Sequence, residues 1–534
     1  MNDDKDLQAA EKEYESLSPF ELKNKLIELA EAHHEHLMLN AGRGNPNWLA
    51  DIPRHAFSQL QLFALAEAKR VMDQPGFAGS PVRAGVGERF NRFVAMHAEV
   101  EGVAFLKESV AWCGDNLGIA HDDLVFELVD GILGDHYPSP DRMLSASELI
   151  VRAYLELEMC KGAPPPGKFD LFATEGGTAA MSYIFNSLME NKLLHKGDKI
   201  ALGTPIFTPY LEIPALNDYQ FLELEIQQSE DDAWQYPDSE LDKLRDPSVK
   251  AFFLVNPANP SSVAMHPDSL ARIASIVAEE RPDLILLTDD VYGTFVNDFQ
   301  SLASICPQNT ILVYSFSKYF GATGWRLGVI AIHQDNVFDQ QIAALDSADK
   351  EALRARYATV VLEPDKMKLI DRLVADSRAV ALNHTAGLST PQQIMMVLFS
   401  LAGLLDKAHN SEYKQAARAI VRERFETLFS ALGEPCPEDE FSAFYYVDID
   451  IPRLAQNRYG EAFAEHLFND HEPIDFVWRL ATEKSVVLMD GGGFDAPKMS
   501  VRVSLANLNN DAYAVIGKAI SDLLEEYYTS WKQA

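Results

Sequence analysis

The residues best suited to chemistry lie in the segment SFSKYFGATGWRLG, which begins at Ser315. Lys318 follows the apolar run 311–314, so we expect it beyond the carboxyl end of a strand, the edge where α/β sheets bind ligands. A lysine there can form a Schiff base with an aldehyde and then act as a general base. Ser315, Ser317 and Arg326 add two hydroxyls and a fixed charge, which suit a phosphate dianion. A lone SxSK more simply marks a strand end with a solvated lysine, but an arginine eight residues later, among glycines, disfavours that alternative.

A second candidate is the glycine pair in TEGGTAAM, where Gly176, Gly177 and Thr178 stand between a short apolar run and a helical segment. Backbone N–H groups at a helix N-terminus bind anions, and glycines allow the anion to approach closely. A plain turn is the alternative explanation of GGT on its own. The sequence therefore offers two candidate anion-binding segments on either side of the chain's middle.

Three further motifs each follow an apolar run. TPIFTPY contains Phe207, NPANPSS contains Asn259, and TDDVYGTF contains Asp289 and Tyr292. Taken singly, each has an ordinary explanation: a buried core aromatic, a tight Asn-Pro turn, or a carboxylate that caps the next helix. In MSVRVSLAN, Arg502 falls in the middle of a predicted strand, where a charge is costly unless it faces a partner.

Alternating apolar runs and helical segments between about residues 170 and 335 must position these side chains. The runs are nearly continuous in Val, Ile, Leu and Phe, as in strands covered on both faces. Helical segments lie between them, for example 178–194 and 269–280. The predicted strands are 199–202, 251–255, 284–287, 311–314 and 327–332. This alternation predicts an α/β domain with a mainly parallel sheet.

The two ends of the chain have a different pattern. Ser-Pro-Phe-Glu at residues 18–21 forms a capping box ahead of a helix that we expect to run to about Leu39, followed by a loop over 40–46. Residues 336–380 are expected to be a helical insertion. The tail predicts half-exposed strands and an amphipathic helix, hence a smaller α+β domain, over 444–449, 486–489, 500–505 and 511–531.

Length sets the domain organisation, since 534 residues are too many for one hydrophobic core. We expect residues 1–60 to form an N-terminal segment that is partly in the small domain. Residues 61–394 should form the large domain, and residues 395–534 the C-terminal small domain.

Composition excludes several classes of function. The formal net charge of −34 argues against a nucleic-acid surface, which needs a basic patch. No apolar stretch reaches the ~20 residues of a membrane helix, and the acidic start does not resemble a secretion signal, so a cytoplasmic location is expected. The scattered cysteines form no CxxC pair and no zinc cluster. We expect all of them to be buried as small hydrophobes: Cys113, Cys160, Cys306 and Cys436.

Taken together and in order, these motifs resemble the fold type I enzymes that depend on pyridoxal 5′-phosphate (PLP), the aspartate aminotransferase superfamily. The matches span residues 137–502. The resemblance implies the α/β fold type I architecture, with Lys318 as the residue that carries the cofactor. It also implies that the cofactor phosphate is held by the two anion-binding segments through Gly176, Gly177, Thr178, Ser315, Ser317 and Arg326.

The same resemblance assigns residues around the cofactor ring. Phe207 is expected to stack on the pyridine ring, and Asn259 to hydrogen-bond its phenolic oxygen; the Ser-Ser that follows Asn259-Pro departs from the family's usual Thr-Gly. Asp289, with Tyr292 in an Asp-x-x-Tyr pattern, is expected to pair with the ring nitrogen and raise its pKa. Asp290 is the competing carboxylate, but its spacing to the tyrosine does not match.

Substrate and assembly follow from the resemblance too. Arg502 is expected to grip the substrate α-carboxylate as a bidentate fork, together with Asn259. Tyr137, in GDHYPSPDRML, resembles a tyrosine that reaches the phosphate of the neighbouring subunit, which implies at least a dimer. No metal is needed for this chemistry.

Within that superfamily, the long N-terminal region, the 336–380 insertion, NAGRGNPNW at 40–48 and DGGGF at 490–494 look like the L-aspartate 4-decarboxylases. That family converts aspartate to alanine and CO2, has secondary aminotransferase activity, and forms large assemblies of dimers. Arg43 and Arg378 are candidates to contact the side-chain carboxylate, although Arg43 could equally be solvated or in a surface ion pair.

Two alternatives remain open from the sequence. An aspartate or aromatic aminotransferase without decarboxylation shares the same motifs. A transcription regulator with a PLP-type domain is disfavoured, because the acidic N-terminal segment has no basic recognition helix.

Overall fold

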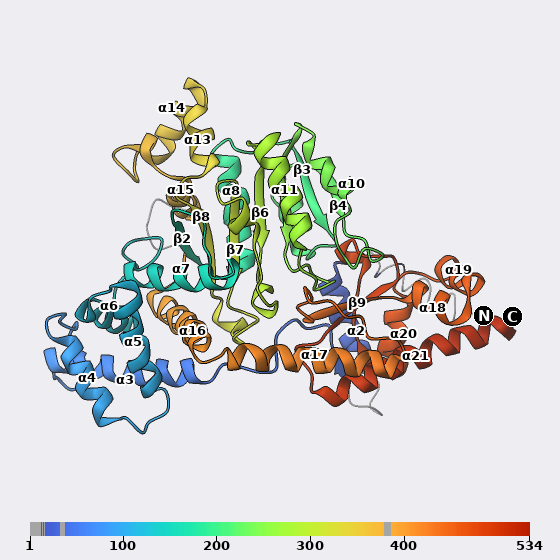
Figure 1. The fold of residues 1–534 in the computed structure, drawn as a ribbon, viewed down its shortest axis with the longest axis horizontal. Helices are drawn as coiled ribbons and strands as arrows, with labels where there is room; N and C mark the ends of the chain where they lie inside the picture. Colours follow the sequence, from blue (N-terminus) through green and yellow to red (C-terminus); the bar gives the residue numbers. More distant parts are fainter. Residues whose placement is uncertain (1–11, 13, 15–16, 32–37, 379–385, 534) are drawn as a thin grey trace.

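The computed structural model describes residues 12, 14, 17–31, 38–378 and 386–533. Its centre is a seven-stranded sheet with strand order β2-β8-β7-β6-β5-β3-β4 (Figure 1). Strand β8 pairs antiparallel with both of its neighbours, and the other neighbouring strands pair in parallel. The bounds are β2 Phe169–Thr174, β3 Lys199–Thr204, β4 Leu222–Gln227, β5 Val249–Val255, β6 Ile285–Asp289, β7 Thr310–Ser315 and β8 Gly328–His333. The prediction of a mainly parallel sheet is confirmed.

Both faces of this sheet are covered, which explains the uninterrupted apolar runs. In β5, Phe253 packs in one core cluster and Phe252 in another, because successive side chains point to opposite faces. Helix α11 (Pro267–Glu279) contributes to the second cluster, while α8 (Gly177–Glu190) packs on β7 and β8. The prediction missed β2 and β4. In β4 most side chains are exposed, so this edge strand has no continuous apolar run.

Helices extend the large unit at both ends (Figure 1). The 336–380 insertion is helical as expected in its described part, with α13 (Val337–Ala344), α14 (Ser347–Tyr357) and α15 (Leu369–Asp376). At the other end lie α3 Ile52–Val71, α4 Val86–Met96, α5 Val103–Leu117, α6 His121–Leu133, α7 Ser145–Met159 and α16 Thr390–Ala408. Short helices between the strands are α9 Pro209–Leu216, α10 Asp238–Leu241 and α12 Leu302–Ile305.

The N- and C-terminal segments build a second α+β unit beside the sheet. Strand β9 (Tyr446–Asp450) pairs antiparallel with β12 (Ser500–Ser504), which also pairs with β11 (Met489–Asp490). The long helices α17 (Glu412–Leu432) and α21 (Asn510–Gln533) pack together along this unit. The remaining helices are α2 Pro19–Glu31, α18 Ile451–Tyr459, α19 Glu461–Asp470 and α20 Asp475–Lys484.

Several expectations for the ends need correction. The strands of the tail are buried rather than half-exposed, because helices and the N-terminal segment cover both faces. Leu39 does not end a helix: Leu39–Asn40 is strand β1, which pairs in parallel with β10 (Val486–Val487). A partner more than 440 residues away overrides the local helical pattern. The Ser18 cap is present, with the N–H of Glu21 donating to its hydroxyl over 3.4 Å, and the described part of α2 ends at Glu31.

Of the four cysteines, three are buried, but Cys436 is exposed, which corrects that part of the expectation. Among the residues described, no helix is long and apolar enough to cross a membrane.

Candidate active site

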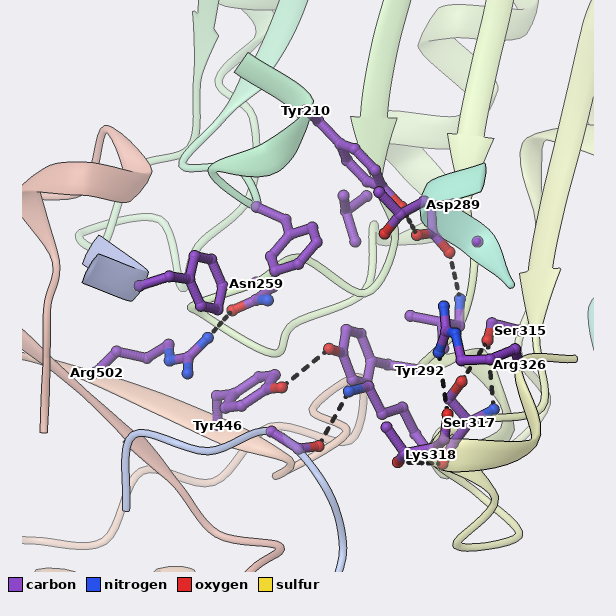
Figure 2. Close-up of a pocket in the computed structure, with 18 residues that line it drawn as sticks. Tyr210, Asn259, Asp289, Tyr292, Ser315, Ser317, Lys318, Arg326, Tyr446 and Arg502 are labelled. Atoms are coloured by element: carbon purple, nitrogen blue, oxygen red, sulfur yellow. Dashed lines mark hydrogen bonds between the residues drawn. The ribbon is translucent and has the colours of Figure 1, made fainter. Parts of the chain in front are cut away.

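A cavity of about 160 Å³ lies where the carboxyl ends of the central strands meet the second unit (Figure 2). Strands β6 and β7 end at Asp289 and Ser315, so the residues at and after each end reach the same edge of the sheet. The residues that line it are Phe20, Gly44, Gly177, Thr178, Phe207, Tyr210, Val255, Asn259, Asp289, Val291, Tyr292, Ser315, Ser317, Lys318, Thr323, Arg326, Tyr446 and Arg502. Three cations and one carboxylate are in this set, so the cavity is locally positive in a strongly acidic protein.

Lys318 stands three residues beyond the end of β7, with its amino group directed into the cavity (Figure 2). Its Nζ donates to the carbonyl oxygen of Gly44 over 3.0 Å. That is the one hydrogen bond recorded for this amino group within the described residues. The lysine is therefore held in the cavity by a single neutral hydrogen bond, and it makes no recorded ion pair with a carboxylate in the described part of the chain.

The two predicted anion-binding segments meet on one side of the cavity. Gly177 and Thr178 begin helix α8, so its N-terminal N–H groups face this region. Ser315 and Ser317 are buried beside them, and their hydroxyl oxygens are 2.9 Å apart. Arg326 completes the set, and its guanidinium makes no recorded ion pair in the part of the chain described here.

Glycine is required where these segments cross. Gly176 has φ = 98°, and a Cβ there would collide with the guanidinium of Arg326. A Cβ on Gly328 would lie 2.6 Å from the carbonyl carbon of Gly176. Arg326 itself adopts the left-handed conformation, with φ = 56°. The strained backbone at Arg326 therefore brings the arginine close to the N-terminus of helix α8.

Asp289 ends strand β6, and its carboxylate reaches the floor of the cavity. Tyr210 donates its hydroxyl to Oδ2, and the N–H of Val291 donates to Oδ1 over 3.1 Å. Burial raises the pKa of Asp289 to about 6, although both hydrogen bonds oppose this shift. A buried carboxylate of this kind is suited to pair with a protonated ring nitrogen.

The competing carboxylate, Asp290, lies outside the lining of the cavity. It accepts a hydrogen bond from Thr288, and burial raises its pKa to about 7. Successive residues point in opposite directions at a strand end, so only one of the two adjacent aspartates can face the site.

Aromatic side chains form another wall. Phe207 lines the cavity and packs edge-on against Phe20 and Tyr210, with ring centroids 5.8 and 5.2 Å away. Tyr292 donates its hydroxyl to that of Tyr446 over 3.1 Å. Figure 2 shows this tyrosine pair between the lysine and the arginine end of the cavity.

Arg502 is buried, with only 2% of its surface exposed, and belongs to strand β12. Its Nη1 donates to Oδ1 of Asn259 over 3.2 Å, and its Nη2 to the carbonyl oxygen of Gly42 over 2.8 Å. Its Nε has no recorded partner within the described structure. Asp448, opposite Arg502 in the strand pairing, makes no recorded ion pair with it among the described residues, and burial raises the pKa of Asp448 to about 8. A buried guanidinium without an ionised partner is a ready site for a carboxylate.

Three residues singled out in the sequence do not line the cavity. Tyr137 is 66% exposed on the surface. Arg43 is also exposed, but its neighbours Gly42 and Gly44 touch Arg502 and Lys318 through their carbonyl groups. The side chain of Arg378 is 4% exposed and ion-paired with Asp141 at 3.2 Å, and Arg378 is not among the residues that line the cavity.

Other lining residues escaped the sequence analysis. Tyr210 lies in the same TPIFTPY motif as Phe207, three residues on, so the motif itself carried a signal. Gly44 lies in the NAGRGNPNW segment that was noted without a role for the glycine. Phe20 and Tyr446 come from the two ends of the chain, and nothing local in the sequence places them here.

Comparisons with known proteins agree with this geometry. The family model described as aminotransferase class I and II matches residues 172–520. A bifunctional aspartate aminotransferase and L-aspartate beta-decarboxylase from a Pseudomonas species is 53% identical over 526 residues, covering 98% of this chain and 99% of that protein. An aspartate aminotransferase of Pyrococcus abyssi is 33% identical over 143 residues, 26% of this chain and 36% of that one.

Solved structures share the fold at low identity. The aromatic aminotransferase of Pyrococcus horikoshii has a TM-score of 0.59 at 16% identity, covering 94% of this chain and 99% of that one. The Thermus thermophilus aspartate aminotransferase with maleate has a TM-score of 0.55 at 17% identity, covering 95% and 96%. The expected fold type I architecture is confirmed. With a family model over most of its length and a near full-length relative at 53% identity, this chain belongs to the class I and II aminotransferase family.

Proposed function

We propose that the protein is a PLP-dependent enzyme that converts L-aspartate to L-alanine and CO2, with a secondary aminotransferase activity. The observation that carries this proposal is the cavity itself, which brings together Lys318, the buried carboxylate of Asp289 and the buried guanidinium of Arg502, whose Nε has no recorded partner among the described residues. The near full-length relative that is both an aspartate aminotransferase and a beta-decarboxylase supports the choice of substrate and reaction.

The residues present fit PLP. Gly176 and Gly328 approach each other so closely that neither position has room for a side chain. The N-terminus of helix α8 is thereby left open to a phosphate. Ser315, Ser317 and Arg326 supply hydroxyl and guanidinium donors for the same group. When bound, PLP supplies an aldehyde for covalent attachment and a ring that accepts the electron pair released from the substrate.

Around the ring, we propose that Asp289 pairs with the pyridine nitrogen and keeps it protonated, with Tyr210 holding the carboxylate in place. Phe207 packs against one ring face. Asn259 holds the phenolic oxygen, with Tyr292 beside it in the lining of the cavity. Because Oδ1 of Asn259 already accepts from Arg502, its amide nitrogen is left to donate.

Lys318 has two tasks in this proposal. It holds the cofactor through Nζ until the substrate amino group displaces it, and the freed amine then takes the proton from the substrate Cα. Its single contact with the Gly44 carbonyl orients the amine without tying it to a carboxylate. Arg502 meanwhile grips the α-carboxylate with its fork, which fixes the orientation of Cα toward the lysine.

We further propose that Arg43 contacts the side-chain carboxylate. Burial lowers the pKa of Lys23, and the nearby charges of Arg43 and Arg502 lower it further, so these cations gather near one end of the cavity. An exposed arginine binds a carboxylate loosely, which favours the loss of CO2 over its retention. The ion pair of Arg378 with Asp141 argues against that residue for this role.

The assembly is also a proposal. We infer a homo-oligomer of at least two subunits, in which Tyr137, whose side chain is exposed at the surface, reaches the cofactor phosphate of a neighbouring subunit. Keto acids are further substrates of the secondary activity, and a cytoplasmic location stays a prediction from the sequence.

Product analysis tests the reaction. Purified protein with PLP and L-aspartate, and no added keto acid, is expected to release CO2 and alanine in equal amounts over many turnovers. An aspartate aminotransferase without decarboxylation is the second candidate, supported by the aminotransferase relatives. It would release no CO2 and would form oxaloacetate only after 2-oxoglutarate is added, an outcome that would contradict the proposed reaction.

The raised pKa of Asp289 predicts how cofactor binding depends on pH. The pKa of Asp289 is about 6 in the folded protein and about 3.9 in the unfolded chain. At pH values between these two, the cofactor-free protein therefore binds a proton at Asp289 when it folds. Ionised Asp289 therefore lowers the stability of the cofactor-free protein as pH rises through that window, and a protonated pyridine relieves the cost. PLP affinity is expected to be about tenfold weaker at pH 5 than at pH 7.5, because at pH 5, one unit below the pKa, only about a tenth of Asp289 is ionised.

The measurement is a fluorescence titration of the cofactor-free protein with PLP across this range. Asp289→Asn serves as the control, because it keeps the titration of the phosphate and loses that of the carboxyl. The same pH profile in both proteins would contradict the assignment of Asp289.

A further inference from the structure

Tyr446 is a polar residue of the cavity that neither the sequence motifs nor the proposed roles above account for. It begins strand β9, is 3% exposed, and its hydroxyl reaches the cavity. A Cβ added to Gly44 would collide with this hydroxyl and would lie 3.3 Å from Nζ of Lys318. The tyrosine hydroxyl and the lysine amine therefore flank the same glycine, and Figure 2 shows Tyr446 between Lys318 and Arg502.

The hydrogen bonds of Tyr446 leave its own proton available. Tyr292 donates to the Tyr446 oxygen over 3.1 Å. Burial raises the pKa of Tyr292 well above its usual value, so Tyr292 keeps its proton and remains the donor. No acceptor for the Tyr446 proton is recorded among the described residues, so the hydroxyl is free to donate into the cavity.

The ring of Tyr446 lies beside the arginine proposed to bind the substrate. The guanidinium carbon of Arg502 stands 4.3 Å from the centroid of this ring, a cation–π contact. With the α-carboxylate on Arg502 and Cα facing Lys318, as proposed above, we place the substrate side chain against the wall that Tyr446 and Gly44 form. In that arrangement the hydroxyl is a donor to the β-carbon.

Resting on the reaction proposed above, we infer that Tyr446 is the catalytic acid that protonates the β-carbon after CO2 has left. The bond between Cβ and the side-chain carboxylate breaks, CO2 departs, and the electron pair returns to form a new C–H bond at Cβ with the hydroxyl proton of Tyr446. The phenolate recovers a proton from solvent, and the ammonium group of Lys318 returns to Cα the proton that it took earlier. Aspartate and one proton thus give alanine and CO2, without any oxidant or reductant.

Tyr446→Phe tests this inference, because it keeps the ring under Arg502 and removes only the hydroxyl. Alanine formation from L-aspartate is expected to fall by about 100-fold or more, the range for a positioned general acid. Oxaloacetate formation with 2-oxoglutarate is expected to stay within about threefold, so the ratio of alanine to oxaloacetate falls by a similar factor. PLP titration of the cofactor-free variant and calorimetric binding of succinate to the loaded variant are both expected to match the wild type.

The matched control is Tyr236→Phe, which removes the hydroxyl of another tyrosine that is 3% exposed and lies outside the cavity. Its alanine-to-oxaloacetate ratio is expected to be that of the wild type. If Tyr446→Phe forms alanine at the wild-type rate, Lys318 delivers the proton and the inference is wrong. Loss of PLP or succinate binding in Tyr446→Phe would equally overturn it, in favour of a role in holding ligands. A wild-type protein that forms no alanine would instead refute the proposed reaction, so the two failures are distinguishable.

Discussion

Replacing Lys318 with alanine is expected to lower turnover of L-aspartate by at least about 10⁴-fold, with the fold intact. The substitution removes both the amine that holds the cofactor and the base that takes the Cα proton. It costs the folded protein little, because the amine makes one recorded hydrogen bond, to the Gly44 carbonyl. The measurements are CO2 release in the presence of PLP, the absorbance of the bound cofactor, and the thermal unfolding midpoint.

Lys199→Ala is the matched control. Lys199 is the first residue of strand β3, so it lies at the amino ends of the parallel strands, opposite to the carboxyl ends that form the cavity. It is ion-paired with Asp246 at 3.0 Å. Loss of a partly exposed ion pair is expected to change stability by less than about 1 kcal/mol and to leave turnover unchanged. Wild-type activity in Lys318→Ala would refute the assignment of the site as a whole, because every other role depends on this lysine.

Replacing Arg502 with alanine is expected to lower kcat/KM for aspartate by about 10³-fold, equivalent to about 4 kcal/mol of lost binding in the transition state. Its Nε has no recorded partner among the described residues, and its other donors face an amide oxygen, a backbone carbonyl and a sulfur atom. Burying a cation without an ionised partner costs energy. Truncation therefore removes that cost together with some packing, and the unfolding free energy should change by no more than about 2 kcal/mol.

Arg281 is a buried arginine that does have a carboxylate partner, and it serves as the control. It is 3% exposed, pairs with Asp283, and donates to the carbonyl groups of Leu244, Asp246 and Val249. Arg281→Ala is expected to lose more stability than Arg502→Ala and to keep the wild-type kcat/KM. Steady-state kinetics and denaturant unfolding of both variants provide the test. An unchanged kcat/KM in Arg502→Ala would remove this arginine from substrate binding.

The sequence alone determined the core of the sheet and the set of residues at its edge. Strands β5, β6 and β7 were predictable because sheets covered on both faces need continuous apolar runs. Parallel strands present their carboxyl ends at one edge, so Asp289 and Lys318 could be expected near each other without knowing the structure. The requirement for glycine at residue 176 was visible in the same way, as a glycine pair before a helix.

The tertiary structure decided how the two ends of the chain meet each other and the sheet. Leu39 pairs with Val486, and the carbonyl of Gly42 meets Arg502, 460 residues later. No local periodicity encodes such contacts, because their energy comes from pairing and burial between segments that are independent until the chain folds. Burial of the tail strands has the same origin. Tyr446 shows the consequence: it reads as an ordinary strand residue, and only the approach of Gly44, Tyr292 and Arg502 gives its hydroxyl a place in the cavity.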